Sequence, residues 1–115
     1  MSEGNRLNAS QEALLDAWKR TLPETLNPGD SVELFLDQAD NDALRIHIEV
    51  AGRTGYSFDF KVKYVDDREV EVSLVDAERE GVTVDERTET IQNLIEDYVR
   101  HIHECAQALH TLTHQ

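Results

Sequence analysis

Apolar and polar residues alternate along the middle of the chain in four segments. A period of two places every second side chain on the same face of a strand. The apolar positions of the two clearest segments are Leu44, Ile46, Ile48 and Val50, followed by Tyr56, Phe58, Phe60, Val62 and Tyr64. The pattern predicts strands over Ser31–Asp37, Ala43–Val50, Tyr56–Val65 and Glu69–Val75.

Short polar links separate the predicted strands. Asn27–Asp30 has Pro and Gly at its central positions, which is typical of a type II turn just before the first strand. Links this short pair sequence neighbours antiparallel, so we expect a four-stranded meander in the order 1-2-3-4. One face of this sheet is apolar and the other charged, which indicates helices on one side and solvent on the other.

An apolar spacing of three and four residues predicts two helices that flank the strands. The first begins near Asn8 or Ser10 and ends at Pro23, whose ring and missing N–H interrupt a helix. Trp18 lies on its apolar side and is interpreted as a core residue. We expect this helix to cover the apolar face of the sheet.

The second helix is predicted to be long, because residues 84–114 contain neither Gly nor Pro. At its start, Thr83-Val84-Asp85-Glu86 has the pattern of a capping box. We therefore expect one α+β domain over residues 1–115, with residues 1–6 disordered and both helices on the apolar face of the sheet.

The net charge of the chain argues against some classes of binding partner. It carries 24 Asp and Glu against 11 Lys and Arg, a formal net charge of −13. Such a surface repels nucleic acid and anionic lipid, so we expect no direct binding to either. Acidic excess with few lysines is also expected of a protein adapted to molar salt, where the Debye length falls to about 3 Å. In that case the negative charge reflects the salt concentration of the protein's environment and does not indicate a binding partner.

Several features favour a cytoplasmic protein. No apolar run approaches the ~18 residues of a membrane span, and the first residues lack the pattern of a signal peptide. The single Cys105 has no second cysteine with which to form an internal disulfide, as expected in a reducing compartment.

Histidines on the last predicted helix are the first candidate site. His110 and His114 have the i, i+4 spacing of a helical metal pair, and His103 falls on the same polar side. A zinc site needs a third ligand, and the sequence has no HExxH motif or cysteine pair to supply it. We interpret these histidines as a solvated helix face and predict no metal and no cofactor.

Two further arrangements of residues are candidates for a catalytic site. Cys105 follows His101 by four residues, but it lies on the apolar stripe of the helix, where a buried and inert thiol is expected. Glu49 and Asp59 would form an acid–base pair if they faced each other across the second and third strands, but a solvated sheet face would not separate their pKa values, so we interpret them as solvated charge. We therefore predict no catalytic residues.

Two other patterns concern the turn between the first two strands and the end of the last helix. The spacing of Asp37, Asp40 and Asp42 resembles the start of a calcium loop, but it lacks the following glycine and the bidentate glutamate, so we interpret it as a turn. At about 42 Å, the last helix exceeds the ~26 Å of an eight-residue strand. The surplus apolar stripe forms a candidate interface, with the first helix or with a second copy, at Cys105, Leu109 and Leu112.

These observations favour a non-enzymatic interaction protein, an adaptor, chaperone or inhibitor that binds another protein or a second copy of itself. Its arrangement of helix, meander and long acidic helix resembles that of small secretion-type chaperones in layout and charge, which likewise implies a protein partner. One alternative is a small-molecule or metal-binding domain with a pocket near Trp18, Tyr56, Tyr64 and the histidines. Another is a nucleic-acid mimic that presents carboxylates to a basic protein.

Overall fold

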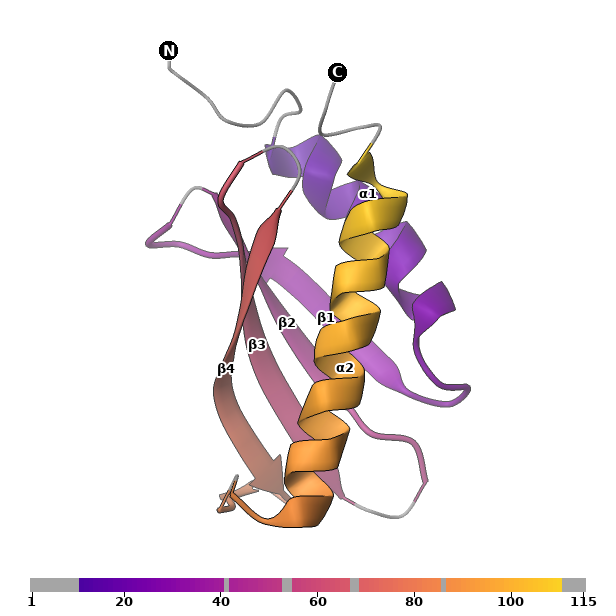
Figure 1. Cartoon of the computed structure of the whole chain (residues 1–115), viewed down its shortest axis with the longest axis vertical. Coiled ribbons are helices and arrows are strands. Elements are labelled where there is room, and N and C mark those ends of the chain that lie inside the picture. The colour runs from indigo at the N-terminus through magenta and orange to yellow at the C-terminus, as the bar shows by residue number, and fades with distance from the viewer. Residues whose placement is uncertain (1–10, 41, 53–54, 67–68, 86, 111–115) are drawn as a thin grey trace.

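The computed structural model describes residues 11–40, 42–52, 55–66, 69–85 and 87–110. This part of the chain forms two helices and five strands (Figure 1). They are α1 (Gln11–Thr25), β1 (Ser31–Leu36), β2 (Ala43–Glu49), β3 (Tyr56–Tyr64), β4 (Val70–Arg79), β5 (Val82–Thr83) and α2 (Glu89–Ala108). The predictions for residues 1–6 and for Asn8, Ser10, Leu112 and His114 lie outside the described residues.

The strands form one antiparallel sheet in the order β1-β2-β3-β4-β5 among the described residues. The predicted α+β class and meander are confirmed, with one difference, the short additional strand β5. Residues 77–82, predicted as a link, instead form the end of β4, a tight turn and the start of β5. The two turn residues Glu80 and Gly81 have φ values of 54° and 84°, as a type I′ hairpin turn requires, so the chain returns directly beside β4.

A bulge explains why β4 extends beyond the predicted end at Val75. Leu74 lies opposite Phe60, whereas Asp76 lies opposite Asp59, so Val75 is an extra residue in β4. The extra residue shifts the alternation by one position, and Ala77 rather than Asp76 is buried in the core. The alternation rule applied without a bulge therefore ended the strand too early.

The first helix passes through the proline that was predicted to end it. α1 continues to Thr25, two residues beyond Pro23. Pro23 removes one N–H near the end of the helix, and the last turn is held by other contacts. Leu22 is fully buried, and the Thr25 hydroxyl is 2.9 Å from the Leu22 carbonyl and 3.4 Å from that of His101 on α2.

The second helix starts later than predicted, because the expected capping box belongs to the sheet. Thr83 lies in β5, and the Val84 N–H donates to the Ala77 carbonyl at 3.0 Å. The residue at the N-cap position is Thr88, whose side chain makes no capping hydrogen bond. With 20 residues, α2 is about 30 Å long rather than the predicted ~42 Å. The helix therefore lacks the extra length, relative to the strands, on which the candidate interface at its end was based.

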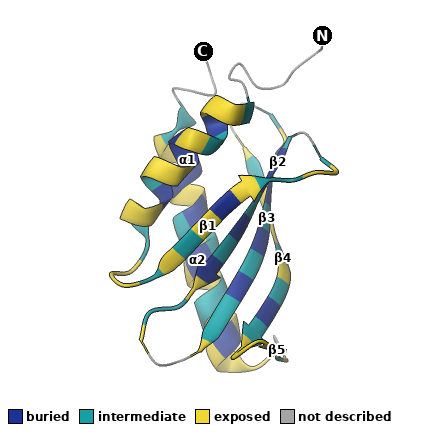
Figure 2. Ribbon diagram, turned by 180° about the vertical axis from the view of Figure 1, so that it is seen from behind, coloured by how far each residue is buried: buried dark blue, intermediate teal, exposed yellow. Residues whose placement is uncertain are grey.

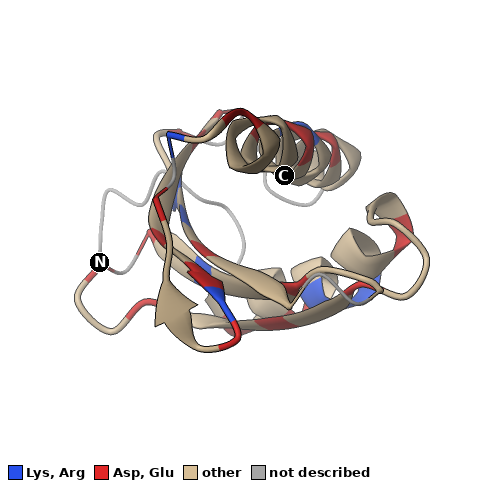
Figure 3. Ribbon diagram, turned by 90° about the horizontal axis from the view of Figure 1, so that it is seen from below, with Lys and Arg blue, Asp and Glu red and all other residues tan. Residues whose placement is uncertain are grey.

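Both helices lie side by side on one face of the curved sheet (Figure 3). This confirms the predicted layers, with the opposite face exposed to solvent. Along β2 and β3, buried residues alternate with more exposed ones (Figure 2). The largest fully buried side chains are Trp18, Leu22, Leu44, Ile46, Ile48, Phe58, Phe60, Val62, Tyr64, Tyr98 and Ile102.

One carboxylate joins three segments that are distant in the sequence. The predicted turn before β1 is confirmed by the Asp30 N–H to Asn27 carbonyl bond of 3.1 Å and by the φ of 91° at Gly29. The Asp30 carboxylate then accepts hydrogen bonds from the Ala51 N–H at 2.7 Å, the Tyr98 hydroxyl at 2.9 Å and the Asn27 N–H at 3.2 Å. The turn, the end of β2 and the middle of α2 are therefore held at one point.

Candidate functional site

The solvent face of the sheet divides into an acidic and a basic half. Register places Ser31, Glu49, Ser57 and Glu78 in one row, and Glu33, His47, Asp59 and Asp76 in the next. The third row contains Phe35, Arg45, Lys61 and Ser73. We refer to His47, Glu49, Asp59, Asp76 and Glu78 as the carboxylate–histidine cluster.

The bulge in β4 completes this cluster. Without the extra residue Val75, the alternation of the strand would turn Asp76 and Glu78 toward the core. With the bulge, Asp76 lies opposite Asp59 and Glu78 opposite Ser57 on the solvent face. The only signal in the sequence is that apolar residues change from even to odd positions along β4, which is why sequence reasoning missed the cluster.

His47 lies at the centre of the cluster, between two carboxylates. Its Nδ1 is 2.8 Å from Asp59 Oδ1, and its Nε2 is 3.4 Å from Glu49 Oε2. Partial burial disfavours the imidazolium, but the hydrogen bonds and charges of Asp59 and Glu49 outweigh it and raise the pKa of His47 above its ordinary value. In the charged form, both ring nitrogens donate to a carboxylate.

This geometry favours ion pairing over acid–base chemistry. A general base needs an unprotonated nitrogen directed at a substrate, whereas both nitrogens of His47 are directed at carboxylates. Glu49 and Asp59, considered above as an acid–base pair, do not face each other, because Glu49 lies opposite Ser57 and Asp59 lies opposite His47. The register of β2 against β3 could not be read from alternation alone.

Mutual repulsion also raises the proton affinity of a carboxyl group in the cluster. Hydrogen bonding to Asp76, partial desolvation and the charges of Asp76 and Asp59 raise the pKa of Glu78 above its ordinary value. Beside the cluster lies a depression of about 410 Å³ whose lining includes Glu49, Glu78 and Glu80. Among the described residues, carboxylates therefore outnumber cationic side chains in the acidic half of the solvent face.

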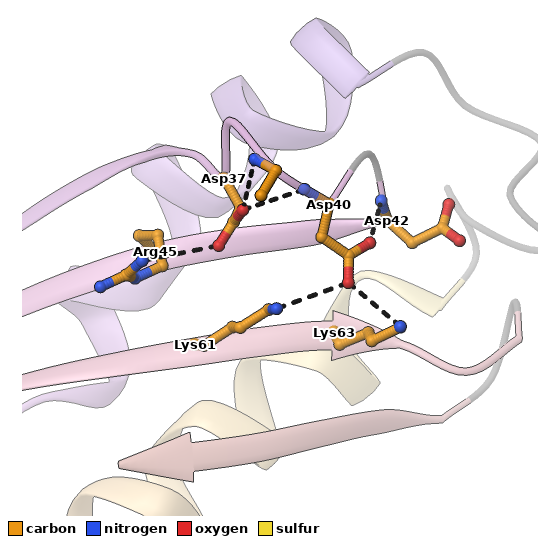
Figure 4. A network of polar contacts seen from close by, with 7 residues as sticks. Asp37, Asp40, Asp42, Arg45, Lys61 and Lys63 are labelled. Carbon is orange, nitrogen blue, oxygen red and sulfur yellow. Dashed lines mark hydrogen bonds and ion pairs between the residues drawn. The ribbon is translucent and has the colours of Figure 1, made fainter. Parts of the chain in front are cut away.

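The basic half is neutralised by the turn between β1 and β2 (Figure 4). Asp40 Oδ2 lies 3.0 Å from Lys63 Nζ and 3.5 Å from Lys61 Nζ, and Asp37 Oδ2 lies 3.6 Å from Arg45 Nη1. Asp37 Oδ1 also accepts from the backbone N–H groups of Ala39 and Asp40, at 2.8 and 3.0 Å. These backbone bonds, together with the charges of Lys61 and Arg45, lower the pKa of Asp37 below its ordinary value.

This turn does not have the arrangement of a calcium loop. The carboxylates of Asp37 and Asp40 accept hydrogen bonds from backbone N–H groups of the turn and pair with Arg45, Lys61 and Lys63. In the described residues, no group of three or more His, Cys, Asp or Glu side chains is arranged to hold a metal ion. His114 lies outside the described residues, so the predicted spacing of His110 and His114 is not tested.

A second surface feature lies at the outer edge of β1. Among the described strands, only β2 pairs with β1. The Asp37 N–H donates to the Ala43 carbonyl at 3.1 Å, so by alternation the backbone groups of Val32, Leu34 and Leu36 point away from β2. A groove of about 490 Å³ runs along this edge between α1 and β1, lined by Lys19, Pro23, Val32, Glu33, Leu34 and Phe35.

Phe35 is the exposed aromatic residue of this edge. Its side chain is 49% exposed on the solvent face, whereas Leu34 beside it is 7% exposed and packed in the core. An edge strand whose outward backbone groups have no strand partner among the described residues, and which carries an exposed aromatic residue, is a template for pairing with another chain. The open edge therefore has the features of a contact surface for an extended segment.

Cys105 and His101, the candidate catalytic pair on α2, have different surroundings. Cys105 is fully buried beside Tyr64, and burial raises the pKa of its thiol to about 12. His101 Nδ1 lies 3.2 Å from Glu104 Oε1. A thiol held neutral by burial is not activated as a nucleophile, in agreement with the core interpretation.

Two of the three candidate interface residues lie in the described part of α2 and its end. Cys105 is 0% exposed, so it offers no surface to a partner of the folded chain. Leu109 is half-buried against the core at the C-cap of α2. Leu112 lies outside the described residues, and an interface there stays a prediction.

The aromatic residues expected to line a ligand pocket are not brought together. Trp18 and Tyr64 contact each other within the core, with Trp18 Nε1 donating to the Tyr64 hydroxyl at 3.1 Å. Tyr56 is at the other end of β3, where Arg79 Cζ lies 5.5 Å from its ring centroid. The two sites are separated by the length of the strand.

The raised pKa of His47 predicts a pH-dependent contribution to stability. In the unfolded chain His47 has its ordinary pKa, so its ion pairs stabilise fully below that value and are lost as pH rises through the higher folded pKa. We expect His47→Gln to abolish a few tenths up to about 1 kcal/mol of this dependence. Urea unfolding from about pH 5 to about pH 9 measures it, with His103→Gln on the exposed side of α2 as control. Equal pH slopes in His47→Gln and the native protein would contradict the assignment.

No helix in the described part of the chain combines the length and apolar character needed to cross a membrane. Comparison of the chain with models of protein families, with curated proteins and with solved structures finds no significant match, so the functional argument rests on the geometry of this molecule.

Proposed function

We propose that this protein is a non-enzymatic interaction module that binds an extended segment of another protein at the outer edge of β1. The open edge carries this proposal. Strand addition uses backbone hydrogen bonds for affinity and side-chain grooves for selection. Both are offered here, by Val32, Leu34 and Leu36 and by the groove of about 490 Å³ beside them.

The arrangement of the two faces supports this function. A segment added to β1 would direct alternate side chains into the groove beside α1 and onto the solvent face next to Phe35. The core beneath is already filled, with Leu34, Leu44 and Ile46 buried, so the edge accepts a strand without rearrangement of the sheet. A nucleic-acid mimic would need a continuous run of carboxylates, whereas Arg45, Lys61 and Lys63 interrupt this face.

Selection from a displayed library of random peptides tests the proposal. We expect selected peptides to protect the amide protons of Val32, Leu34 and Leu36 from hydrogen exchange, because these groups would donate to the added strand. Val32→Pro should reduce binding about tenfold or more, since proline removes an outward N–H while leaving the bonds to β2 intact. Thermal unfolding checks that the variant remains folded.

A matched pair of surface variants locates the binding site. Phe35→Lys places a charge beside the proposed strand, whereas Val65→Lys alters a residue of similar exposure, 47% against 49%, beyond the end of β3. We expect only Phe35→Lys to weaken peptide binding. Peptides that protect amides elsewhere, or that bind Val32→Pro and Phe35→Lys with unchanged affinity, would refute the proposed edge.

A further inference from the structure

The two sides of the β1 edge differ in charge, and the difference restricts what an added strand can carry. The groove between α1 and β1 is lined by the apolar residues Pro23, Val32, Leu34 and Phe35 and by the charged residues Lys19 and Glu33. On the solvent side, a separate depression of about 260 Å³ is lined by Ser31, Val32, Glu33, His47 and Glu49. The two sides therefore select different side chains.

In the part of the chain that the structure describes, the acidic side has more carboxylates than cationic side chains. His47 is the one basic side chain in the rows formed by Glu33 and Glu49, which also contain Asp59, Asp76 and Glu78. Arg45, Lys61 and Lys63 lie in the adjacent basic half and pair with Asp37 and Asp40. A cationic side chain beside Glu33 and Glu49 would gain attraction from these carboxylates.

The side of the β1 edge that faces α1 determines which residues of an added strand must be apolar. Val32, Leu34 and Pro23 favour an apolar side chain in the groove, and Lys19 repels a Lys or Arg side chain there. Glu33 also lines the groove, but the alternation of β1 directs its side chain to the solvent face. Successive residues of a strand face opposite sides, so apolar and basic residues must alternate. We propose that the edge of β1 binds an extended partner segment in which apolar residues facing α1 alternate with Lys or Arg residues facing Glu33 and Glu49.

A second copy of the chain is a poorer occupant of the same edge. Its β1 alternates Val32, Leu34 and Leu36 with Ser31, Glu33 and Phe35, and therefore presents an acid where the site favours a base. Each chain also has a formal net charge of −13, which opposes self-association at low salt. Charge complementarity thus favours a basic partner segment over a β1–β1 dimer.

This inference rests on the proposed function, and a panel of synthetic peptides separates the two. Short capped peptides of alternating Val and Lys, Val and Thr, or Val and Glu differ only in the residues that would face the acidic side. At low salt we expect the Val–Lys peptide to bind about tenfold more tightly than Val–Thr, and Val–Glu to bind most weakly. The preference should shrink as salt screens the charges.

Charge reversal supplies the second measurement. In Glu33→Lys/Glu49→Lys we expect the preference to change toward Val–Glu, whereas Glu69→Lys/Glu96→Lys, with the same change in net charge at exposed sites elsewhere, should retain the Val–Lys preference. Glu33→Gln/Glu49→Gln, which removes charge without adding repulsion, should bind the three peptides with more similar affinities. Circular dichroism verifies the fold of each variant.

The outcomes distinguish the inference from the function on which it rests. Equal binding of Val–Lys and Val–Thr, with the amides of Val32, Leu34 and Leu36 protected, would overturn the charge preference and leave strand addition standing. Failure of every peptide to protect these amides would overturn both. A dimer in sedimentation that buries the same amides, and that Val–Lys does not displace, would assign the edge to a second copy.

Discussion

Replacing Trp18 with alanine is expected to lower the free energy of unfolding by about 3–5 kcal/mol. Trp18 is fully buried, and its ring meets that of Tyr64 edge to face, with centroids 6.5 Å apart and planes at 89°. Removing the indole leaves a cavity between α1, β3 and α2 that the surrounding helices fill only in part. Because domains are typically stable by 5–15 kcal/mol, this change takes a large fraction of the total.

The hydrogen bond between Trp18 and Tyr64 can be separated from the packing. Tyr64→Phe keeps the ring but leaves Trp18 Nε1 without its acceptor at 3.1 Å, an expected cost of about 1–3 kcal/mol. Trp18→Phe similarly leaves the Tyr64 hydroxyl without its donor. In the double variant both polar groups are removed, so we expect a loss smaller than the sum of the two single losses.

Urea denaturation followed by circular dichroism compares the native protein with Trp18→Ala, the two single variants Tyr64→Phe and Trp18→Phe, and their double variant. Val65→Ala serves as a control, because this exposed residue lies outside the core. Additive losses in the double variant would show that the indole–hydroxyl bond contributes nothing beyond packing. A loss below about 1 kcal/mol for Trp18→Ala would contradict the close packing of this site.

The sheet was largely predictable because the alternation of apolar and polar residues in each strand shows which of its residues are buried. Residues such as Ile46, Ile48, Phe58 and Phe60 alternate with polar neighbours, and this local pattern is sufficient to identify β2 and β3. The sequence predictions were wrong where pairing with a distant segment of the chain determined the local structure. Thr83 has the local pattern of a helix cap, but pairing with Glu78 places it in β5 instead.

The surface features could not be predicted in the same way, because they depend on register. A shift of one residue in β4, at Val75, decides whether Asp76 and Glu78 face the core or the solvent. The predicted strand order already makes β1 an edge, but the groove beside it depends on how α1 packs against Val32 and Leu34, which the alternation of β1 does not specify. Sequence patterns identified the strands, whereas their mutual placement defines the proposed binding surface.

Asp30 is the clearest case of a residue whose role appears only in the folded chain, and its removal is expected to cost about 2–4 kcal/mol. Asp30→Ala leaves the Ala51 and Asn27 N–H groups and the Tyr98 hydroxyl without their shared acceptor. Hydrogen bonds to a charged group contribute about 1.5–3 kcal/mol each, but neighbouring bonds are not additive and water reaches part of this site. The estimate is therefore below the sum of three such bonds.

More conservative variants show how much each hydrogen bond of Asp30 contributes to the free energy of unfolding. Asp30→Asn offers one acceptor oxygen in place of two, and the Tyr98 hydroxyl can reverse its role to accept from the amide, whereas a backbone N–H cannot. We expect a loss between that of Tyr98→Phe, about 1 kcal/mol, and that of Asp30→Ala. Asp66→Ala, at an acid whose Oδ1 accepts from the Glu69 N–H in an exposed turn, is the matched control with a smaller expected loss.

Hydrogen exchange in Asp30→Ala adds a test that global stability does not provide. Because Asp30 joins the turn before β1 to Ala51 and α2, its loss should raise exchange first in β1, and the amides of Val32 and Leu34 should become less able to pair with an added strand. Peptide binding at the edge should therefore weaken in this variant, although Asp30 does not line the groove of about 490 Å³. Unchanged exchange in β1, with a uniform rise elsewhere, would show that Asp30 stabilises the fold without positioning the edge.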